Sequence, residues 1–310
     1  MEFVHKPVLF NESIENLCIK PDGVYVDGTI GGAGHSLAIT KSLNERGMLI
    51  GIDRDVEALN VSRQRLIDAV PRIELVNDNY KNMKSILANL GIAGVDGILL
   101  DLGVSSYQLD NADRGFSYRF DAPLDMRMNT NDKITAKDVV NNCTKEELVK
   151  IFRDYGEEKW ASRIADFIVE KRQKVEISTT FQLVDIIKAA VPVGARDDGH
   201  PAKRVFQALR IYVNDEISEL RESVLNAIDC LNTGGRLCII TFHSLEDRIV
   251  KDVFTEEAKA CICPPDFPSC VCGKVSKINI ITKKPILPST KELSENNRSH
   301  SAKLRVAEKK

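Results

Sequence analysis

Residues 24–35 read Val24-Tyr25-Val26-Asp27-Gly28-Thr29-Ile30-Gly31-Gly32-Ala33-Gly34-His35, and residues 50–53 read Ile50-Gly51-Ile52-Asp53. The first stretch combines a short apolar run, a glycine-rich turn and the start of a helix. The second is an apolar strand that ends on an acid. This order predicts the opening βαβ unit of a nucleotide-binding sheet. Asp53 follows Gly31 by 22 residues, and a carboxylate at this spacing accepts hydrogen bonds from both hydroxyls of a ribose.

The spacing of the glycines separates two classes of nucleotide ligand. A dinucleotide-binding loop has the form G-x-G-x-x-G, and Leu37 stands where the third glycine is expected. Asp27, at the end of the first strand, would repel a diphosphate but would attract the ammonium or sulfonium of S-adenosylmethionine. The stretch therefore favours a methyltransferase over a dehydrogenase. A glycine turn that binds no ligand is the plainer alternative.

Composition restricts the class of protein further. The 310 residues are 43% hydrophobic, enough for a substantial core in one or two domains. No apolar run approaches the roughly 18 residues of a membrane span, and the N-terminus lacks the apolar core of a signal peptide. We therefore expect a cytoplasmic protein that does not bind membranes, with its eight cysteines reduced. A net charge of −2 argues against indiscriminate binding to nucleic acid.

Five further apolar runs extend the predicted sheet to seven strands. They cover residues 73–76, 96–101, 237–242, 278–282 and 303–306. Tyr80 follows the third strand, where it either packs against an adenine ring or serves as an ordinary tyrosine at the edge of the core. Asp101 ends the fourth strand, and ligands of open α/β sheets lie at that carboxyl end.

A helical segment interrupts the alternation of strands and helices. No strand-like run occurs between Asp110 and Ala202. The first of three predicted helices there begins with a capping box, Thr144 with Glu147. Apolar residues then keep helical spacing from Val205 to Ile228, which predicts one long helix of roughly 28 residues leading back to the sheet. We therefore divide the chain into a cofactor-binding domain, residues 1–109 and 213–310, and an inserted helical domain for substrate recognition, residues 110–212.

Eight segments spread over the chain resemble the motifs of the RsmH (MraW) family. They are His5-x-Pro7-Val8-Leu9, Asp27-Gly28-Thr29-x-Gly31-x-x-Gly34-His35, Asp101-Leu102-Gly103-Val104-Ser105-Ser106-x-Gln108-Leu109-Asp110, Arg114-Gly115-Phe116-Ser117 with Pro123-Leu124-Asp125-Met126-Arg127-Met128, His200-Pro201-Ala202, Phe242-His243-Ser244-Leu245-Glu246-Asp247-Arg248, and Ser301-Ala302-Lys303-Leu304-Arg305. This family methylates the N4 of a cytosine in bacterial small-subunit ribosomal RNA. The resemblance implies a class I (Rossmann-like) S-adenosylmethionine-dependent methyltransferase fold.

The resemblance also implies a set of cofactor-binding residues and a substrate. The cofactor would be held by Ala33, Gly34, His35, Asp53, Tyr80, Asp101 and Gln108. The substrate would be 16S ribosomal RNA within the small subunit or its precursor, modified at cytosine 1402 in standard numbering. Two positions depart from the family: Ala33 replaces a common glycine, and Tyr80 stands where relatives often have phenylalanine. The chain is compatible with a homodimer.

The residues that carry the chemistry and bind RNA are less well defined by the sequence. Asp125 and His243 are candidates for a catalytic role, structural hydrogen bonding is the plainer explanation of both, and water can take the proton if no base is needed. Five basic residues lie near the motifs and form a candidate RNA face, although each is also compatible with an ordinary surface ion pair. They are Arg127, Lys203, Arg204, Arg210 and Arg248.

Four cysteines within 12 residues raise the question of a metal site. Cys261, Cys263, Cys270 and Cys272 could bind zinc tetrahedrally. Their C-x-C spacing is less typical of zinc sites than C-x-x-C, so free or redox-labile thiols are favoured over zinc at this stage.

Two other functions are compatible with the same fold. One is a methyltransferase that acts on a protein or a free nucleotide, against which the long helical insertion with its arginines argues. The other is a ribosome-assembly factor without catalytic activity, against which the intact glycine loop and Asp53 argue.

Overall fold

The computed structural model describes residues 7–105, 108–109, 111–195, 200–264 and 269–310. They divide into two compact units: a sheet unit, Met1–Gly103 with Ile217–Lys310, and an insertion unit, Val104–Glu216. The insertion expected at residues 110–212 lies within the second of these. Three motif residues, His5, Ser106 and Asp110, lie outside the described residues.

The sheet unit contains the predicted seven-stranded sheet, in the order β3-β2-β1-β4-β5-β7-β6. The strands are β1 (Val24–Asp27), β2 (Met48–Asp53), β3 (Arg72–Asn77), β4 (Val95–Asp101), β5 (Leu231–Thr241), β6 (Ile278–Ile280) and β7 (Lys303–Lys309). Strands β1 to β5 are parallel, whereas β7 runs antiparallel to both of its neighbours. This is the Rossmann-like α/β architecture that the sequence predicts.

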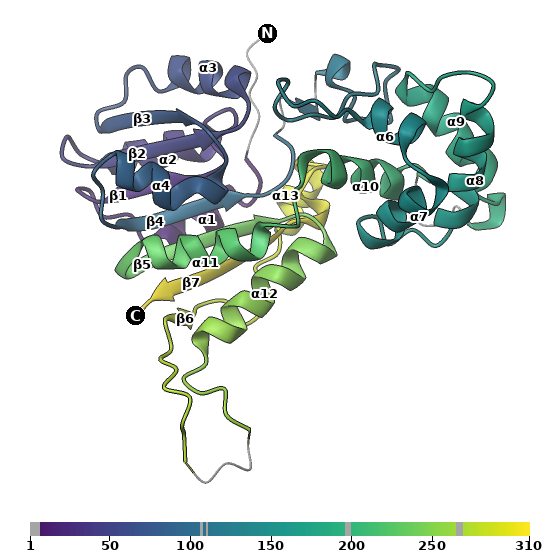
Figure 1. Ribbon diagram of the computed structural model, residues 1–310. Helices are drawn as coiled ribbons and strands as arrows, with labels where there is room; N and C mark the ends of the chain where they lie inside the picture. Colours follow the sequence, from purple (N-terminus) through teal and green to yellow (C-terminus); the bar gives the residue numbers. More distant parts are fainter. Residues whose placement is uncertain (1–6, 106–107, 110, 196–199, 265–268) are drawn as a thin grey trace. The chain divides into compact units, whose positions relative to one another are not determined.

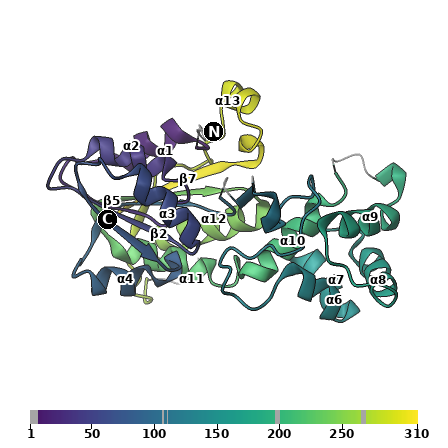
Figure 2. The ribbon, with the colours of Figure 1, turned by 90° about the horizontal axis from the view of Figure 1, so that it is seen from above.

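Alternate residues of the central strands pack on opposite faces of the sheet. Val26 and Ile98 belong to one buried cluster, and their neighbours Tyr25 and Leu99 belong to the other. Both faces are therefore apolar, as a parallel sheet between two helical layers requires. The layers are visible in Figures 1 and 2, with α1 (Phe10–Leu17), α2 (Gly34–Ser42) and α3 (Val56–Arg65) on one face and α4 (Met83–Asn89), α11 (Leu220–Cys230) and α12 (Ser244–Ala258) on the other. Within the described residues, none of the helices has the length and hydropathy to cross a membrane.

The insertion unit is helical and has a core of its own. Its helices are α6 (Ala136–Asn142), α7 (Lys145–Asp154), α8 (Ala161–Arg172), α9 (Thr180–Ala190) and α10 (Lys203–Asn214). Leu148, Ile164, Leu183 and Leu209 are fully buried in one cluster that joins these helices. The predicted capping box of Thr144 and Glu147 is present. Helix α6 was not predicted, because its seven residues are too few for a clear apolar period. The sequence feature that could have revealed α6 is the capping box at its start, Thr135 with Asp138.

The predicted long helix from Val205 to Ile228 is wrong. Two helices, α10 and α11, occupy this stretch, and they are separated at Asp215, whose φ of 51° is left-handed. The backbone N–H of Asp215 donates to the carbonyls of Ile211 and Tyr212, which closes the end of α10. Aspartate tolerates this conformation better than most residues. The apolar spacing of the two helices happens to continue across the break, so periodicity alone merged them.

Candidate functional site

The glycine-rich loop connects the carboxyl end of β1 to α2 and leaves no room for side chains at two positions. A Cβ on Gly28 would lie 2.5 Å from Leu100 Cδ2, and one on Gly34 would lie 2.4 Å from Pro7 Cγ. Ala33 has a φ of 59°, in the left-handed region that favours glycine. An alanine in this conformation costs about 1 kcal/mol relative to glycine. The loop therefore retains a glycine-like backbone even where a methyl group has been added.

Asp53, at the end of β2, is hydrogen-bonded to this loop. Its Oδ2 accepts a hydrogen bond of 2.8 Å from the Gly31 N–H, and its Oδ1 accepts one of 2.9 Å from the Asp55 N–H. Burial raises the pKa of Asp53 to about 6 despite these two bonds. The carboxylate is thus positioned beside the loop, at the carboxyl edge of the sheet, but it is less stable there than in water.

Asp27 is a second acid at the same edge, and it is fully buried. Its Oδ2 accepts a 2.6 Å bond from Ser36 Oγ, and its Oδ1 accepts a 3.3 Å bond from the Thr29 N–H. Burial raises its pKa to about 6, with a smaller contribution from the negative charge of Asp53. The carboxylates of β1 and β2 therefore share one region of negative potential.

Asp101, at the end of β4, completes a cluster of three acids with Asp27 and Asp53. Its Oδ1 is enclosed and has no hydrogen-bond partner among the described residues. Burial and the negative charges of Asp27 and Glu246 raise its pKa to about 8. A buried acceptor without a donor is rare in folded proteins and calls for a ligand or a functional role. The geometry suits a cationic or hydrogen-bond-donating ligand.

His35 and Tyr80 lie next to this cluster. His35 Nε2 is 3.2 Å from the Val8 carbonyl oxygen, and its Nδ1 is 4.0 Å from Asp101 Oδ2. Burial lowers the pKa of His35 to about 4, so the ring is neutral at pH 7 and adds no positive charge. Tyr80 begins the turn after β3, and its Cβ would be 3.1 Å from a Cβ placed on Gly28. The structure therefore brings Ala33, Gly34, His35, Asp53, Tyr80 and Asp101 together at one edge of the sheet.

Gln108 belongs to the insertion unit. Its side-chain Oε1 accepts a 3.0 Å bond from the Ser105 N–H, and its own N–H donates to Ser105 Oγ. The amide is buried. Its assignment to the cofactor remains a prediction from the family resemblance.

His243 caps the helix that follows β5, and the structure favours this role over catalysis. Its Nδ1 accepts a hydrogen bond from the Glu246 N–H at 3.4 Å, and its Nε2 lies 3.0 Å from Glu246 Oε1 without forming a hydrogen bond. Glu246 is 2% exposed, and its Oε2 accepts a 2.8 Å bond from the Phe242 N–H. Glu246 was not predicted as a site residue, although its negative charge raises the pKa of Asp101. The sequence feature that could have pointed to Glu246 is its position in the first turn of the helix after β5.

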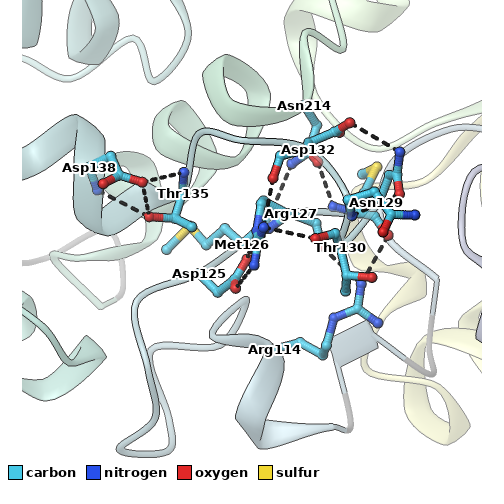
Figure 3. A network of polar contacts seen from close by, with 12 residues as sticks. Arg114, Asp125, Met126, Arg127, Asn129, Thr130, Asp132, Thr135, Asp138 and Asn214 are labelled. Atoms are coloured by element: carbon cyan, nitrogen blue, oxygen red, sulfur yellow. Dashed lines mark hydrogen bonds and ion pairs between the residues drawn. The ribbon is translucent and has the colours of Figure 1, made fainter.

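Asp125 and Arg127 form a bidentate ion pair within a loop of the insertion unit (Figure 3). Arg127 Nε lies 2.8 Å from Asp125 Oδ1, and Arg127 Nη2 lies 2.7 Å from Asp125 Oδ2. Arg127 Nη1 donates to the carbonyl oxygens of Thr130 and Asp132. The hydrogen bonds from Arg127 hold the pKa of Asp125 below its usual range although burial opposes them. A carboxylate with a lowered pKa is a weak base. The hydrogen bonds of Asp125 and Arg127 are therefore better explained by a structural role in holding the conformation of this loop than by catalysis.

The four remaining arginines and lysines of the candidate RNA face differ in their surroundings. Arg210 makes a bidentate pair with Glu216, with N–O distances of 2.8 and 2.9 Å, and only 16% of its side chain is exposed. The guanidinium of Arg210 is therefore engaged at the end of α10, and its contact with RNA stays a prediction. Arg204 Nη1 donates to the Glu157 carbonyl oxygen at 3.3 Å. Lys203 begins α10 in the insertion unit, whereas Arg248 lies on α12 in the sheet unit.

The insertion unit also contains a cavity of about 540 Å³ that the sequence analysis did not anticipate. It is lined by Tyr118, Arg119, Phe181, Val184, Asp185, Lys188 and His200. The rings of Tyr118 and His200 stack with their centroids 4.5 Å apart. Burial and the positive charges of Lys188 and Arg119 lower the pKa of His200, so its ring is neutral at pH 7. Flat rings with two nearby cations suit a base and its phosphate.

The cysteine-rich segment lies between α12 and β6. The Sγ atoms of Cys261, Cys263, Cys270 and Cys272 all lie within 4.8 Å of one another. The free thiols favoured from the sequence therefore converge on one point, in an arrangement compatible with a metal ion.

Comparison with known proteins places this chain in a family. The family model described as "MraW methylase family" matches residues 2–310. The chain is 59% identical to ribosomal RNA small subunit methyltransferase H of Acetivibrio thermocellus and 56% identical to the protein of that name in Clostridioides difficile, and each alignment covers 100% of both chains. It is 58% identical to ribosomal RNA small subunit methyltransferase H 2 of Agathobacter rectalis, over 100% of this chain and 99% of that one. The chain belongs to the MraW methylase family.

Proposed function

We propose that this protein transfers a methyl group from S-adenosylmethionine to the exocyclic N4 of a cytosine in 16S ribosomal RNA, within the small subunit or its precursor. The observation that carries the proposal is the cluster of Asp27, Asp53 and Asp101 beside the glycine loop, with Asp101 Oδ1 lacking a partner among the described residues. Relatives that match the whole chain carry the name of ribosomal RNA small subunit methyltransferase H. Selection of N4 and of cytosine 1402 rests on the family resemblance.

The chemistry of the acid cluster fits this cofactor. S-adenosylmethionine supplies a methyl group on a sulfonium, together with an ammonium and a ribose diol. Asp53 is placed at the loop, where it accepts from ribose hydroxyls. Asp27 and Asp101 supply negative charge for the cationic groups, and Tyr80 supplies a ring for the adenine. A dinucleotide would bring a diphosphate into the same negative region, which makes a dehydrogenase the poorer fit.

We assign no side chain as a general base. The cytosine N4 is a poor nucleophile because its lone pair is delocalised into the ring, so positioning and hydrogen-bond acceptance are the main tasks of the protein. Asp101 at the end of β4 is a candidate acceptor for an N4 hydrogen. Asp125 and His243 are engaged in the loop ion pair and the helix cap. In this proposal the proton leaves to water.

The function is tested by analysing small-subunit RNA from cells that lack this protein. We expect N4-methylcytidine to disappear from the digested nucleosides in mass spectrometry and to return when the wild-type gene is restored. Unchanged N4-methylcytidine would exclude this substrate. Calorimetry with S-adenosylmethionine distinguishes the non-catalytic assembly factor, which would give no binding.

We further propose that the cavity of the insertion unit binds part of the RNA strand. The stacked rings of Tyr118 and His200 offer a surface for a base, and Arg119 and Lys188 offer charge for a phosphate. Replacing Arg119 and Lys188 together with alanine should raise KM for the ribosomal substrate several-fold and flatten its dependence on salt. The expected change in slope is about 0.7 per lost phosphate contact on a single strand. Affinity for S-adenosylmethionine should stay unchanged.

The matched control for this variant is the double replacement of Lys150 and Arg153 with alanine. Both are exposed residues of α7 and do not line the cavity. The control removes the same charge from the same unit, so it separates a local contact from a general electrostatic effect. Equal salt slopes for the two double variants would rule out the cavity as a strand-binding site.

A further inference from the structure

The described residues of the segment between α12 and β6, 259–264 and 269–277, form no hydrophobic core. None of its described residues from 259 to 275 is buried. Ile262, Val271 and Val275 are 64%, 71% and 78% exposed. Figure 1 shows the segment as a long excursion that leaves the end of α12 and returns to β6. Small structures without a core need a covalent or metal crosslink to hold one conformation.

The four cysteines converge at one point of this excursion. Cys261 Sγ lies 3.4 Å from Cys270 Sγ and 3.8 Å from Cys272 Sγ, and the last two sulfurs are 3.5 Å apart. A tetrahedral zinc ion with Zn–S bonds of about 2.3 Å requires sulfurs about 3.8 Å apart. A disulfide requires about 2.05 Å. The observed distances are therefore close to those of a tetrathiolate site.

Backbone N–H groups are directed at three of the sulfurs. Ile262 N lies 3.5 Å from Cys272 Sγ, and Val271 N lies 3.4 Å from Cys263 Sγ, so each limb of the excursion donates to a sulfur of the other. Cys263 N lies 3.3 Å from Cys261 Sγ. Such N–H donors favour the thiolate form, which is the form that binds metal.

The chain also turns where a compact ligand set requires it. Gly273, directly after Cys272, has a φ of 61°, and a Cβ there would meet nothing within 4 Å. Its requirement for glycine is therefore conformational, because a side chain would fit in space but not in this backbone region. This turn directs the second limb back towards β6.

We propose that Cys261, Cys263, Cys270 and Cys272 bind one zinc ion as a structural tetrathiolate site. Each thiol gives up its proton to solvent as a Zn–S bond forms, and the complex of Zn²⁺ with four thiolates carries a charge of −2. Because four protein ligands leave no open position, the ion holds the excursion together and takes no part in methyl transfer. The inference is independent of the proposed function, since it concerns no residue of the acid cluster.

Metal analysis of the full-length protein tests the site. Protein purified under reducing conditions without chelators is expected to contain about one zinc per chain. Replacing that zinc with cobalt(II) should give the intense visible absorption of tetrahedral cobalt thiolate. A zinc content below about a tenth per chain, together with weak octahedral cobalt absorption, would overturn the proposal. Loss of four titratable thiols without any bound metal would overturn it in favour of redox-labile cysteines.

The variant that removes the site is Cys261→Ser combined with Cys272→Ser, and the matched control is Cys18→Ser. Cys18 is an exposed free cysteine at the end of α1. The double variant should lose at least tenfold in zinc content and become sensitive to proteases within residues 259–277, whereas the control should retain both zinc and resistance. Binding of S-adenosylmethionine by both variants verifies that the sheet unit has folded. Full zinc occupancy in the double variant would disprove the assignment of these ligands.

Discussion

Replacing Asp101 with asparagine is expected to stabilise the ligand-free protein at pH 8 and to weaken its binding of S-adenosylmethionine at least tenfold. The pKa of Asp101 is raised to about 8 in the folded protein, against 3.8 as its ordinary value. The folded state therefore binds the proton more tightly than the unfolded state, and stability falls as the pH rises from about 4 to 8. Asparagine cannot ionise, so the variant does not lose this stability as the pH rises.

The thermal midpoint of the Asp101→Asn variant should therefore match that of the wild type near pH 4 and exceed it by several degrees at pH 8. Binding should change in the opposite direction, because the cationic cofactor favours the ionised carboxylate. At pH 6 the wild type should release close to one additional proton on binding relative to the variant, and this difference should fall to about half a proton at pH 8. Calorimetry in buffers of different ionisation enthalpy measures this difference. Equal proton release would show that Asp101 does not face the cation.

Asp96, on the same strand, provides a control, because its contribution to stability should change with pH in the opposite direction. Its carboxylate accepts from Lys20 Nζ at 2.9 Å and from the Val24 N–H at 3.1 Å. These interactions with Lys20 and Val24 outweigh the effect of burial and lower its pKa. A lowered pKa gives stability that is present at neutral pH and lost under acid conditions. Asp96→Asn should therefore destabilise the protein at pH 7 and leave cofactor binding intact. Destabilisation by Asp101→Asn at pH 8 would mean that its carboxylate has a stabilising partner.

The parts of the fold that could be predicted are those where local pattern and tertiary packing agree. β1 and β4 are short apolar runs that end on Asp27 and Asp101, and both strands pack helices on each face. The order of parallel strands then brings these acids to one edge. The sequence could not reveal that Asp101 Oδ1 has no partner in the described part of the chain, because a missing contact depends on every neighbouring side chain. Nor could it reveal that Glu246, 145 residues further along the chain, would raise the pKa of that acid.

Other features could not be predicted, because they depend on a single backbone angle or on residues that meet only in the folded chain. The left-handed conformation of Asp215 ended a helix that apolar spacing had extended. The ion pair of Arg210 with Glu216 could not be predicted either, since a charge in the sequence does not show whether the side chain is paired in the fold. For the cysteines, spacing argued against zinc, whereas the distances between the sulfurs favour it. Ligand geometry is a property of the folded segment, and C-x-C spacing constrains it weakly.

The replacement of Asp53 with alanine is expected to weaken S-adenosylmethionine binding about tenfold to a hundredfold with little loss of stability. A charge-assisted hydrogen bond to the ribose is worth about 1.5–3 kcal/mol, which corresponds to that range of affinity. The variant also leaves the N–H groups of Gly31 and Asp55 without their acceptor, which loosens the loop. Stability should nevertheless change little. The raised pKa of about 6 shows that the buried carboxylate is itself unfavourable at pH 7, so its removal offsets the lost bonds.

Kinetics can separate this role from a structural one. If Asp53 binds the ribose, Asp53→Ala should raise KM for S-adenosylmethionine and leave kcat at saturating cofactor within a few-fold of the wild type. Asp53→Asn keeps one oxygen that can accept a hydrogen bond from the loop. Its KM for S-adenosylmethionine should therefore lie between those of the wild type and of Asp53→Ala. A variant with an unchanged dissociation constant would refute the assignment to the ribose. A fall in kcat with unchanged KM would instead place Asp53 in the reaction itself. Because the pKa of this partly buried acid stays raised despite the hydrogen bonds that it accepts from described residues, the cofactor is the simplest reason for its presence at the end of β2.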